Sequence, residues 1–215
     1  MPRGQLPKRD PSLVLDAHLY DVEALPPSLT SNALFANEQP LEFEIGSGKG
    51  LFIQNAASAR PDHNFVGVEI AKMYAAHAAS RLAKLGLSNA IMVSGDAQKI
   101  LATIPDQSLI AAHIYFPDPW WKKKHKKRRV VNATTVGEIY RALSSRGTLH
   151  FWTDVLEYFE SAIEMIAEEV PQFGPPLPEE ADEDEQTDAI AFRTHFERRS
   201  VQHLIPVYRV RFEKD

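Results

Sequence analysis

The chain has 215 residues, of which 44% are hydrophobic and 25% are charged, and its formal net charge is -5 at pH 7. This length fits one domain with a sizeable core, and the apolar runs are far shorter than the roughly 20 residues of a membrane span, so we expect a soluble protein without membrane contact. Cysteine is absent, which excludes disulfides, thiolate metal sites, catalytic thiols and iron–sulfur clusters held by cysteine.

The first residues and the histidines bear on compartment and metal binding. The opening sequence MPRGQLPKRD is charged but has no apolar segment behind it, so no secretory signal is predicted and the cytoplasm is the expected compartment. The eight histidines include no pair at the i, i+4 spacing of a helical metal site, so we expect no metal. The sequence leaves open whether the protein is a monomer or a homodimer.

Strands and helices are predicted to alternate through most of the chain. Residues 1–40, rich in proline and polar residues, are expected to form an N-terminal arm that is flexible in part. From Leu41 strands are predicted within LEFEI, NFVGVEI, AIMVSGDA, SLIAAHIYF and TLHFWTD. Helical segments separate and follow them, including residues 71–85, 132–143 and 155–170. This alternation predicts an α/β fold, a Rossmann-like, doubly wound and mostly parallel sheet with helices on both faces.

The pattern changes after Val170. Residues 171–189, PQFGPPLPEEADEDEQTDA, combine prolines with an acidic run and are predicted to form a mobile loop. The acids could keep stray polyanions away or serve solubility alone. The segments AFRTHFERR and HLIPVYRVRF alternate well enough for two strands, which are expected to form an antiparallel edge at the C-terminus. Residues 41–215 are therefore predicted to form one domain behind the N-terminal arm.

A glycine cluster follows the first predicted strand. Gly46, Gly48 and Gly50 lie between LEFEI and a helix, where glycine lets the backbone turn sharply and approach a ligand. The spacing departs from the dinucleotide fingerprint G-x-G-x-x-G, because the third glycine comes one residue early. A tight strand-to-helix turn without a ligand explains the cluster equally well.

Acidic residues stand where three successive strands end. Glu44, Glu69 and Asp96 are expected to gather at the carboxyl edge of the sheet, where ligands bind in doubly wound folds. Glu69 is suited to ribose hydroxyls, and the additional acids favour a cationic ligand such as S-adenosylmethionine over NAD. Each acid alone could be a helix cap or a loop residue.

The segment FPDPWWKKKHKKRR, residues 116–129, follows the fourth predicted strand. Two prolines stiffen the backbone around Asp118, and seven of the last eight residues are Lys or Arg. So dense a positive charge is suited to nucleic-acid phosphates, although a solvated face or a targeting signal is the alternative. Trp120 and Trp121 could stack on a base or pack the loop.

Taken together, these motifs resemble the bacterial tRNA (guanine-N7-)-methyltransferase family over about residues 41–213. The resemblance rests on EIGSGKG, NFVGVEI, SGDA, FPDPWWKKKHKKRR, Thr153-Asp154 and the pattern TxFE at residues 194–197. It implies the class I methyltransferase fold, S-adenosylmethionine as the cofactor, and N7 of a variable-loop guanine in tRNA as the acceptor.

The resemblance also implies roles for individual residues. Asp118 takes the catalytic position. Cofactor contacts are implied for the strand-end acids and expected of the glycine turn, at Glu44, Gly46, Gly48, Glu69, Asp96 and Asp118. Substrate contacts are implied for Lys122, Asp154, Thr194, Phe196 and Glu197. Thr153-Asp154 could instead cap a helix. Thr194 and Glu197 have the spacing of a capping box, but they lie in a strand-like run, which favours substrate contact.

Guanine N7 carries a lone pair and no proton, so its methylation needs alignment and no obligatory general base. We expect Asp118, with Asp154 or Glu197, to accept hydrogen bonds from the ring N–H and amino group of guanine, while residues 123–129 attract RNA diffusely. Two alternatives remain. One is a methyltransferase for exocyclic amines of RNA or DNA, suggested by the PDPW loop, and the other is a non-catalytic RNA-binding protein.

Overall fold

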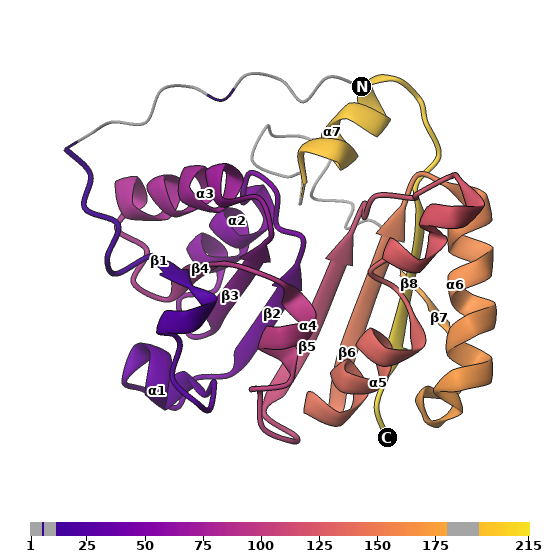
Figure 1. Ribbon diagram of the computed structural model, residues 1–215, viewed down its shortest axis with the longest axis horizontal. Helices are drawn as coiled ribbons and strands as arrows, with labels where there is room; N and C mark the ends of the chain where they lie inside the picture. The colour runs from indigo at the N-terminus through magenta and orange to yellow at the C-terminus, as the bar shows by residue number, and fades with distance from the viewer. Residues whose placement is uncertain (1–5, 7–11, 180–193) are drawn as a thin grey trace.

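The structure, a computed structural model, describes residues 6, 12–179 and 194–215. Within these residues eight strands form one sheet in the order β1-β4-β3-β2-β5-β6-β8-β7 (Figure 1). Strands β1 to β6 pair in parallel, whereas β8 is antiparallel to β6 and to β7. The predicted parallel sheet with an antiparallel C-terminal edge is confirmed. The strands are Leu19–Asp21 (β1), Leu41–Ile45 (β2), Asn64–Glu69 (β3), Ala90–Ser94 (β4), Leu109–Tyr115 (β5), Leu143–Thr153 (β6), Leu177–Pro178 (β7) and Tyr208–Glu213 (β8).

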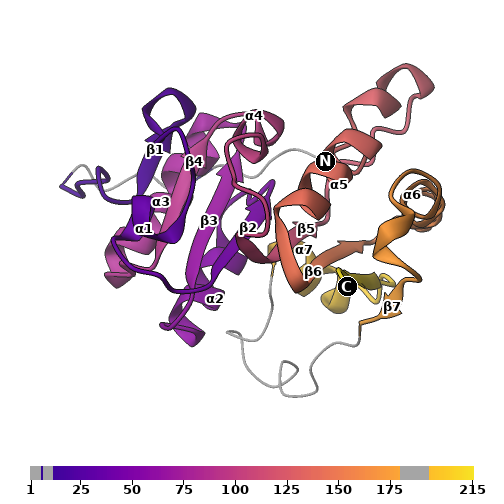
Figure 2. The same ribbon diagram turned by 90° about the horizontal axis from the view of Figure 1, so that it is seen from below.

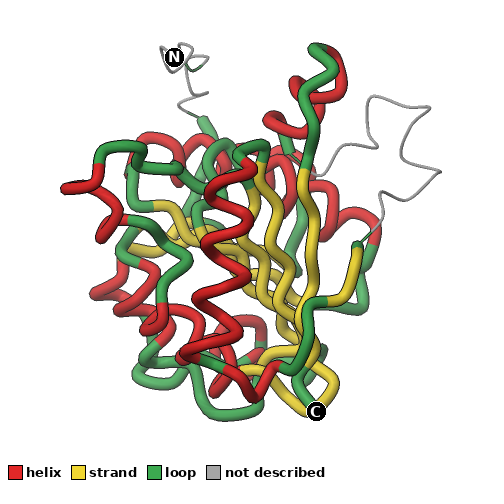
Figure 3. Tube along the Cα trace, turned by 90° about the vertical axis from the view of Figure 1, so that its right-hand side faces the viewer, coloured by secondary structure: helices red, strands yellow, loops and turns green. Residues whose placement is uncertain are grey.

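Helices cover both faces of the sheet. Helices α4, α5 and α6 lie on one side of the sheet and α2 lies on the other (Figure 2). Phe43 on β2 packs in a core cluster with residues of α4, α5 and α6, whereas its neighbour Glu42 contacts Arg60 and His63 after α2, so the side chains of β2 alternate between the two faces. The sheet between the two layers twists across the molecule (Figure 3). The helices are Ser31–Phe35 (α1), Leu51–Ala59 (α2), Lys72–Leu85 (α3), Ala97–Leu101 (α4), Ala133–Ala142 (α5), Leu156–Glu169 (α6) and His195–Gln202 (α7), with 3-10 turns at Val22–Ala24 (η1), Lys123–Arg128 (η2) and Pro171–Phe173 (η3).

Local signals in the sequence mark several helix ends. Asn132 precedes α5, and its side chain accepts a hydrogen bond from the Thr135 amide at 3.1 Å. Gly86 is the C-cap of α3 with a φ of 65°, and its amide donates a hydrogen bond to the carbonyl of Ala83. The predicted helices 71–85 and 132–143 are confirmed within a few residues.

Part of the predicted N-terminal arm belongs to the sheet. Strand β1 pairs in parallel with β4 and forms an edge, and Leu15 and Leu29 are buried. A strand of three residues is too short for a recognisable hydrophobic period, which is why the sequence pattern did not reveal it. Residues 1–5 and 7–11 lie outside the described part.

The predicted loop at 171–189 differs from the structure in its first nine residues. Residues 171–173 form η3 with Phe173 buried, and β7 pairs with β8. Glu179 accepts hydrogen bonds from Trp152 Nε1 at 2.8 Å and His150 Nδ1 at 2.9 Å. Contacts with strands that are distant in the sequence thus give residues 171–179 an ordered structure, although their proline and acid content predicted a mobile loop. Residues 180–193 are not described.

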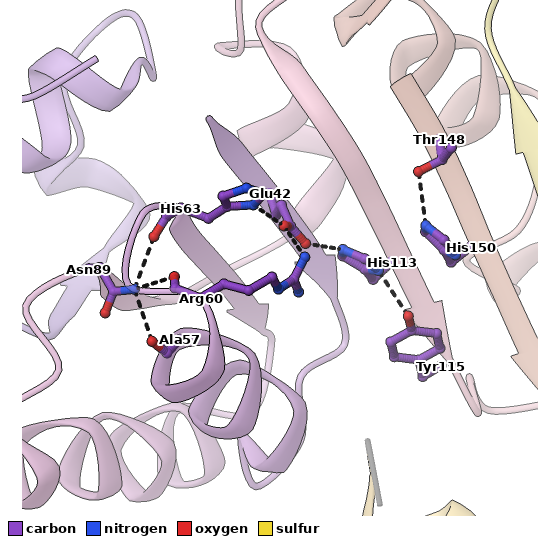
Figure 4. A network of polar contacts seen from close by, with 9 residues as sticks. All are labelled: Glu42, Ala57, Arg60, His63, Asn89, His113, Tyr115, Thr148 and His150. Atoms are coloured by element: carbon purple, nitrogen blue, oxygen red, sulfur yellow. Dashed lines mark hydrogen bonds and ion pairs between the residues drawn. The ribbon is translucent and has the colours of Figure 1, made fainter. Parts of the chain in front are cut away.

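A polar network crosses the sheet on the α2 side (Figure 4). Glu42, 1% exposed, accepts hydrogen bonds from His113 Nε2 at 2.8 Å and His63 Nδ1 at 2.7 Å, and pairs with Arg60. Burial alone raises the pKa of Glu42, but the hydrogen bond and charge of His113 and the charge of Arg60 outweigh it and lower the pKa to about 2. The buried carboxylate is therefore ionised and paired.

We expect this network to make the fold sensitive to acid. The folded-state pKa of Glu42 lies below its ordinary value of 4.5, so its stabilisation is complete above pH 4.5 and is lost as pH falls toward 2. The loss should be about 3 kcal/mol. Urea unfolding between pH 2 and 5 would measure it, and Glu42→Gln should show a flatter dependence. An identical slope in the variant contradicts the assignment.

Candidate active site

The strand-end acids lie along one edge of the sheet. Because β2 to β6 are parallel, their carboxyl ends point the same way, toward α7 (Figure 1). Glu44 lies at the end of β2 and the glycines follow that strand. The remaining acids lie at or after the ends of the other parallel strands. Those acids are Glu69 on β3, Asp96 after β4, Asp118 after β5 and Asp154 after β6. The structure thus brings together the residues expected at this edge.

The glycine turn leaves open space beside the backbone. Gly46, Gly48 and Gly50 have φ values of 77°, 53° and 71°, which side chains rarely adopt. A Cβ atom on Gly46 or Gly48 would meet nothing within 4 Å, whereas one on Gly50 would lie 2.5 Å from Ala78 Cβ. Gly46 and Gly48 therefore leave room for a ligand, and Gly50 allows α2 to approach α3.

Gly50→Ala should destabilise the protein by about 2 kcal/mol or more, since it combines overpacking against Ala78 with a left-handed backbone. Gly137→Ala is a matched control, because Gly137 lies within α5 and a Cβ there meets nothing within 4 Å. The control should stabilise the helix by up to about 1 kcal/mol. Urea unfolding measures both, and equal effects contradict the close-packing role of Gly50.

Glu69 holds the glycine turn in place. Its Oε2 accepts a hydrogen bond from the Gly48 amide at 3.0 Å, and its Oε1 accepts one from the Ala71 amide at 2.8 Å. Each carboxylate oxygen can accept more than one hydrogen bond. Glu69 can therefore support the loop and still accept from ligand hydroxyl groups.

Glu44 is a buried carboxyl group with unmet hydrogen-bonding capacity. It is 3% exposed, and its Oε2 has no hydrogen-bond partner among the described residues. Burial raises the pKa of Glu44 to about 8 against the opposing effect of the nearby Ser47 hydroxyl, and the negative charge of Glu69 adds a smaller rise. Such a group is suited to a cationic partner, which would compensate its charge.

Two other edge acids are exposed. Asp96 caps α4, since its Oδ1 accepts a hydrogen bond from the Gln98 amide at 3.0 Å, so the capping interpretation is confirmed for this residue. Before α6, the hydroxyl of the fully buried Thr153 accepts a hydrogen bond from the Val155 amide at 3.2 Å. The N-cap of α6 is Val155 and no side chain caps this helix, so the interpretation of Thr153-Asp154 as a helix cap is wrong. The Asp154 side chain is exposed at the sheet edge.

The Asp118 loop has an unusual backbone. Phe116 and Trp120, which flank it, have φ values of 49° and 45°, and bulky residues rarely adopt this conformation. The Phe116 amide donates to the Trp152 carbonyl at 2.8 Å, which ties the start of the loop to β6. Asp118 lies between Phe116 and Trp120, and its side chain is exposed. The loop thus presents a carboxylate from a constrained backbone.

The two tryptophans have different surroundings. The Trp120 ring lies edge-on to His125, with centroids 5.7 Å apart, and Arg128 lies over it at 5.1 Å, so Trp120 packs the loop. Trp121 is 62% exposed and can stack on a ligand. The sequence alone left both roles open for each residue.

Most of the basic side chains that the structure describes between residues 122 and 129 are exposed, and the last one is buried. The side chains of Lys122, Lys124, Lys127 and Arg128 are exposed, and η2 carries most of them at the surface. Arg129 is 8% exposed. Arg129 therefore differs from the exposed cations of residues 123–129, since its charge is enclosed by protein and is not at the surface.

The segment 194–197 forms the start of a helix, so the predicted strand here is wrong. Thr194 is the N-cap of α7, and its hydroxyl accepts from the Glu197 amide at 3.0 Å. Glu197 is buried and accepts from Arg209 Nη2 at 3.1 Å. The capping interaction that the spacing indicated has determined the local structure.

Phe196 connects α7 to the Asp118 loop. It is 56% exposed, and its ring stacks against that of Phe116 with centroids 5.9 Å apart. Sequence reasoning identified Phe196 but missed its partner Phe116 and the pairing of Arg209 with Glu197. These contacts join distant segments, so the local sequence carries no signal for them.

Among the described residues, none of the helices has both the length and the apolar character of a membrane span. In the same part of the chain, no group of three or more His, Asp or Glu side chains is arranged to hold a metal ion.

Sequence comparisons relate the chain to known proteins. A family described as "Putative methyltransferase" matches residues 38–210. The tRNA (guanine-N(7)-)-methyltransferase of Rhodopirellula baltica is 53% identical over 220 residues, which cover 100% of this chain and 80% of the relative. The enzyme of the same name from Colwellia psychrerythraea is 42% identical over 132 residues, or 61% of this chain and 54% of the relative.

Solved structures share the fold at low identity. A 16S rRNA (adenine(1408)-N(1))-methyltransferase from Catenulisporales acidiphilia, determined with S-adenosylmethionine, superposes with a TM-score of 0.56 at 16% identity, covering 81% of this chain and 85% of that one. An antibiotic-related methyltransferase gives 0.58 at 15% identity, covering 86% and 94%. The family match over residues 38–210 and the full-length relative at 53% identity place this chain in the tRNA (guanine-N(7)-)-methyltransferase family.

Proposed function

We propose that the protein transfers a methyl group from S-adenosylmethionine to N7 of a guanine in tRNA. The observation that carries the proposal is the position of Asp118, which follows β5 beside the β2 end bearing Glu44 and leads directly into an exposed cationic segment. A cofactor region and an RNA-binding surface thus meet at one carboxylate. Membership of the family supports the same conclusion.

The residues of the glycine turn and the strand ends fit this cofactor. S-adenosylmethionine supplies an electrophilic methyl group on a sulfonium and also carries an ammonium and ribose hydroxyls. Glu44, buried with an unpaired oxygen, would hold the cationic part, and Glu69 would accept from the ribose. Gly46 and Gly48 leave space for the backbone to approach it. Exposed Asp96 would contribute the oxygen that its capping bond leaves unused.

Asp118 would recognise and orient the guanine. Its carboxylate can accept hydrogen bonds from the ring N–H and amino group, which adenine does not present in the same pattern. Positive charge develops on the purine as N7 is methylated, so a nearby carboxylate stabilises the transition state. Alignment of the lone pair contributes up to roughly 7 to 11 kcal/mol in reactions of this kind. Exposed Asp154 is a second acceptor for the base.

The surface around Asp118 supports RNA binding. Lys122 begins the exposed cationic segment, and Trp121 and Phe196 expose aromatic rings near the loop on which bases can stack. Thr194 and Glu197 would act on the substrate through α7, since their own side chains are buried. The variable-loop guanine is the acceptor that we propose within tRNA.

Incubation with labelled S-adenosylmethionine and bulk tRNA, followed by nuclease digestion, tests the proposal. We expect labelled N7-methylguanosine, which carries a fixed positive charge. A labelled exocyclic amine would indicate the alternative methyltransferase. Binding of tRNA without cofactor affinity in calorimetry would indicate a non-catalytic RNA-binding protein. Each of these two outcomes contradicts the proposal.

A further inference from the structure

We propose that Arg129 is a positioning residue that holds the Asp118 loop in its reactive conformation, and that it does not bind RNA phosphate. The inference rests on the proposed methyl transfer to tRNA. Arg129 is the last residue of the basic run, and in sequence nothing separates it from its neighbours. Its surroundings in the fold set it apart.

Arg129 connects the loop to helix α6. Its Nε donates to the carbonyl of Pro119, the residue after Asp118, at 2.9 Å. Its Nη1 donates to Ser161 Oγ at 3.1 Å, and the guanidinium lies 4.4 Å from the centroid of the Tyr158 ring. Ser161 and Tyr158 belong to α6, and Tyr158 is 1% exposed. One planar cation therefore links the loop to a helix anchored in the core.

The backbone of Arg129 is also held. Its carbonyl accepts a hydrogen bond from Asn132 Nδ2 at 2.9 Å, and Asn132 is the N-cap of α5. The Arg129 side chain is thus fixed at its backbone by Asn132 and at its guanidinium by α6. This arrangement gives it the rigidity that a positioning contact requires.

The loop needs an external support of this kind. Left-handed conformations of non-glycine residues, as at Phe116 and Trp120, cost about 1 to 3 kcal/mol each and persist only where the surroundings enforce them. Pro117 and Pro119 have no amide N–H, so the loop has few donors with which to stabilise itself. A donor from outside that binds the Pro119 carbonyl supplies the missing restraint.

Asp118 and Arg129 both act electrostatically on the Tyr158 side chain. Burial raises the pKa of Tyr158 to about 12. The hydrogen bond from the Val131 amide and the charge of Arg129 lower this pKa, and the charge of Asp118 raises it. Both charges therefore act on one phenol. Arg129 is 8% exposed, whereas Lys127 and Arg128 are exposed, so it is these neighbours that are accessible to a phosphate.

The test compares Arg129→Gln and Ser161→Ala with Lys127→Gln, a matched control in the same basic run. Loss of Arg129 should lower kcat about 100-fold through misalignment, with the KM for tRNA and its salt dependence unchanged. Ser161→Ala, which removes one anchor and touches neither loop nor RNA surface, should lower kcat to a smaller extent. Lys127→Gln should keep kcat, weaken tRNA binding and reduce the salt slope by about one.

Arg129→Lys separates charge from geometry, because lysine keeps the charge but cannot reproduce the guanidinium fork. We expect it to lose kcat as Arg129→Gln does. Trypsin cleavage within residues 122–128 without tRNA provides a readout independent of activity, and the Arg129 variants should be cut faster than the wild type. Calorimetry should show an unchanged cofactor Kd.

Two results would overturn the proposal. One is an Arg129→Gln variant that keeps kcat and loses one unit of salt slope, as the Lys127 variant should. The other is full activity and unchanged cleavage in Arg129→Lys, which also decides the matter if Arg129→Gln does not fold. Absence of methyl transfer by the wild type would instead reject the proposed function, and the cleavage comparison would still test the restraint on the loop.

Discussion

Asp118→Asn should reduce the rate of methyl transfer by roughly 100- to 1,000-fold with tRNA and cofactor saturating. The substitution preserves shape but replaces one acceptor oxygen with a donor and removes the negative charge that faces the developing positive charge on the purine. Asp118 is exposed on a constrained loop at the sheet edge, so the effect should lie in chemistry and base selection, with the fold intact. Single-turnover kinetics measure the rate directly.

Asp62→Asn is a suitable control for Asp118. Asp62 is exposed and precedes β3, at the opposite edge of the sheet, so the control should keep the wild-type rate. A tRNA with adenine in place of the target guanine tests base selection. The ratio of the methyl-transfer rates on the guanine and adenine tRNAs should be smaller for Asp118→Asn than for the wild type. Full rate with unaltered preference for guanine in the variant excludes the proposed role of Asp118.

Glu44→Gln should weaken the affinity for S-adenosylmethionine by about 10- to 100-fold, as expected when a hydrogen bond to a charged group is lost. Glu44 has a pKa raised to about 8 by burial and by Glu69. A cationic partner favours its ionised form, so cofactor binding at pH 7 should release a proton and the affinity should rise with pH toward 8. Calorimetry in buffers of different ionisation enthalpy measures the proton release.

The same residue predicts how the stability of the ligand-free protein depends on pH. The folded-state pKa of Glu44 lies above its ordinary value of 4.5, so the folded form binds the proton more tightly than the unfolded form. The stabilisation is fully present below pH 4.5 and is lost as pH rises through about 8. Glu44→Gln should abolish this decline and the proton release. Glu38→Gln, an exposed acid before β2, should retain both, and a wild type without proton release contradicts the assignment.

The sequence was sufficient to predict that the acidic residues at strand ends lie together at one edge of the sheet. Glu44, Glu69 and Asp118 each come directly after or at the end of an apolar segment with strand character. In a parallel sheet, strand ends meet at one edge regardless of strand order. The location of the site therefore follows from local patterns and one topological rule.

Local patterns were less informative where two of them compete. At Thr194 and Glu197 the capping-box spacing indicated a helix and the alternation around it indicated a strand, and the structure forms α7. The pairing of Glu197 with Arg209 and the stacking of Phe196 on Phe116 favour the helix. Both partners are remote in sequence, so this competition is decided by tertiary contacts.

The sequence by itself determined the alternation of strands and helices, the glycine turn, and the acids and cations that make up the site, because hydrophobic period, glycine and charge act over a few residues. Tertiary structure alone decided that β1 joins the sheet edge and that Arg129 is enclosed while Arg128 is exposed. The two arginines are adjacent and chemically identical. Only the packing of α6 and the Pro119 carbonyl around one of them gives it a different environment.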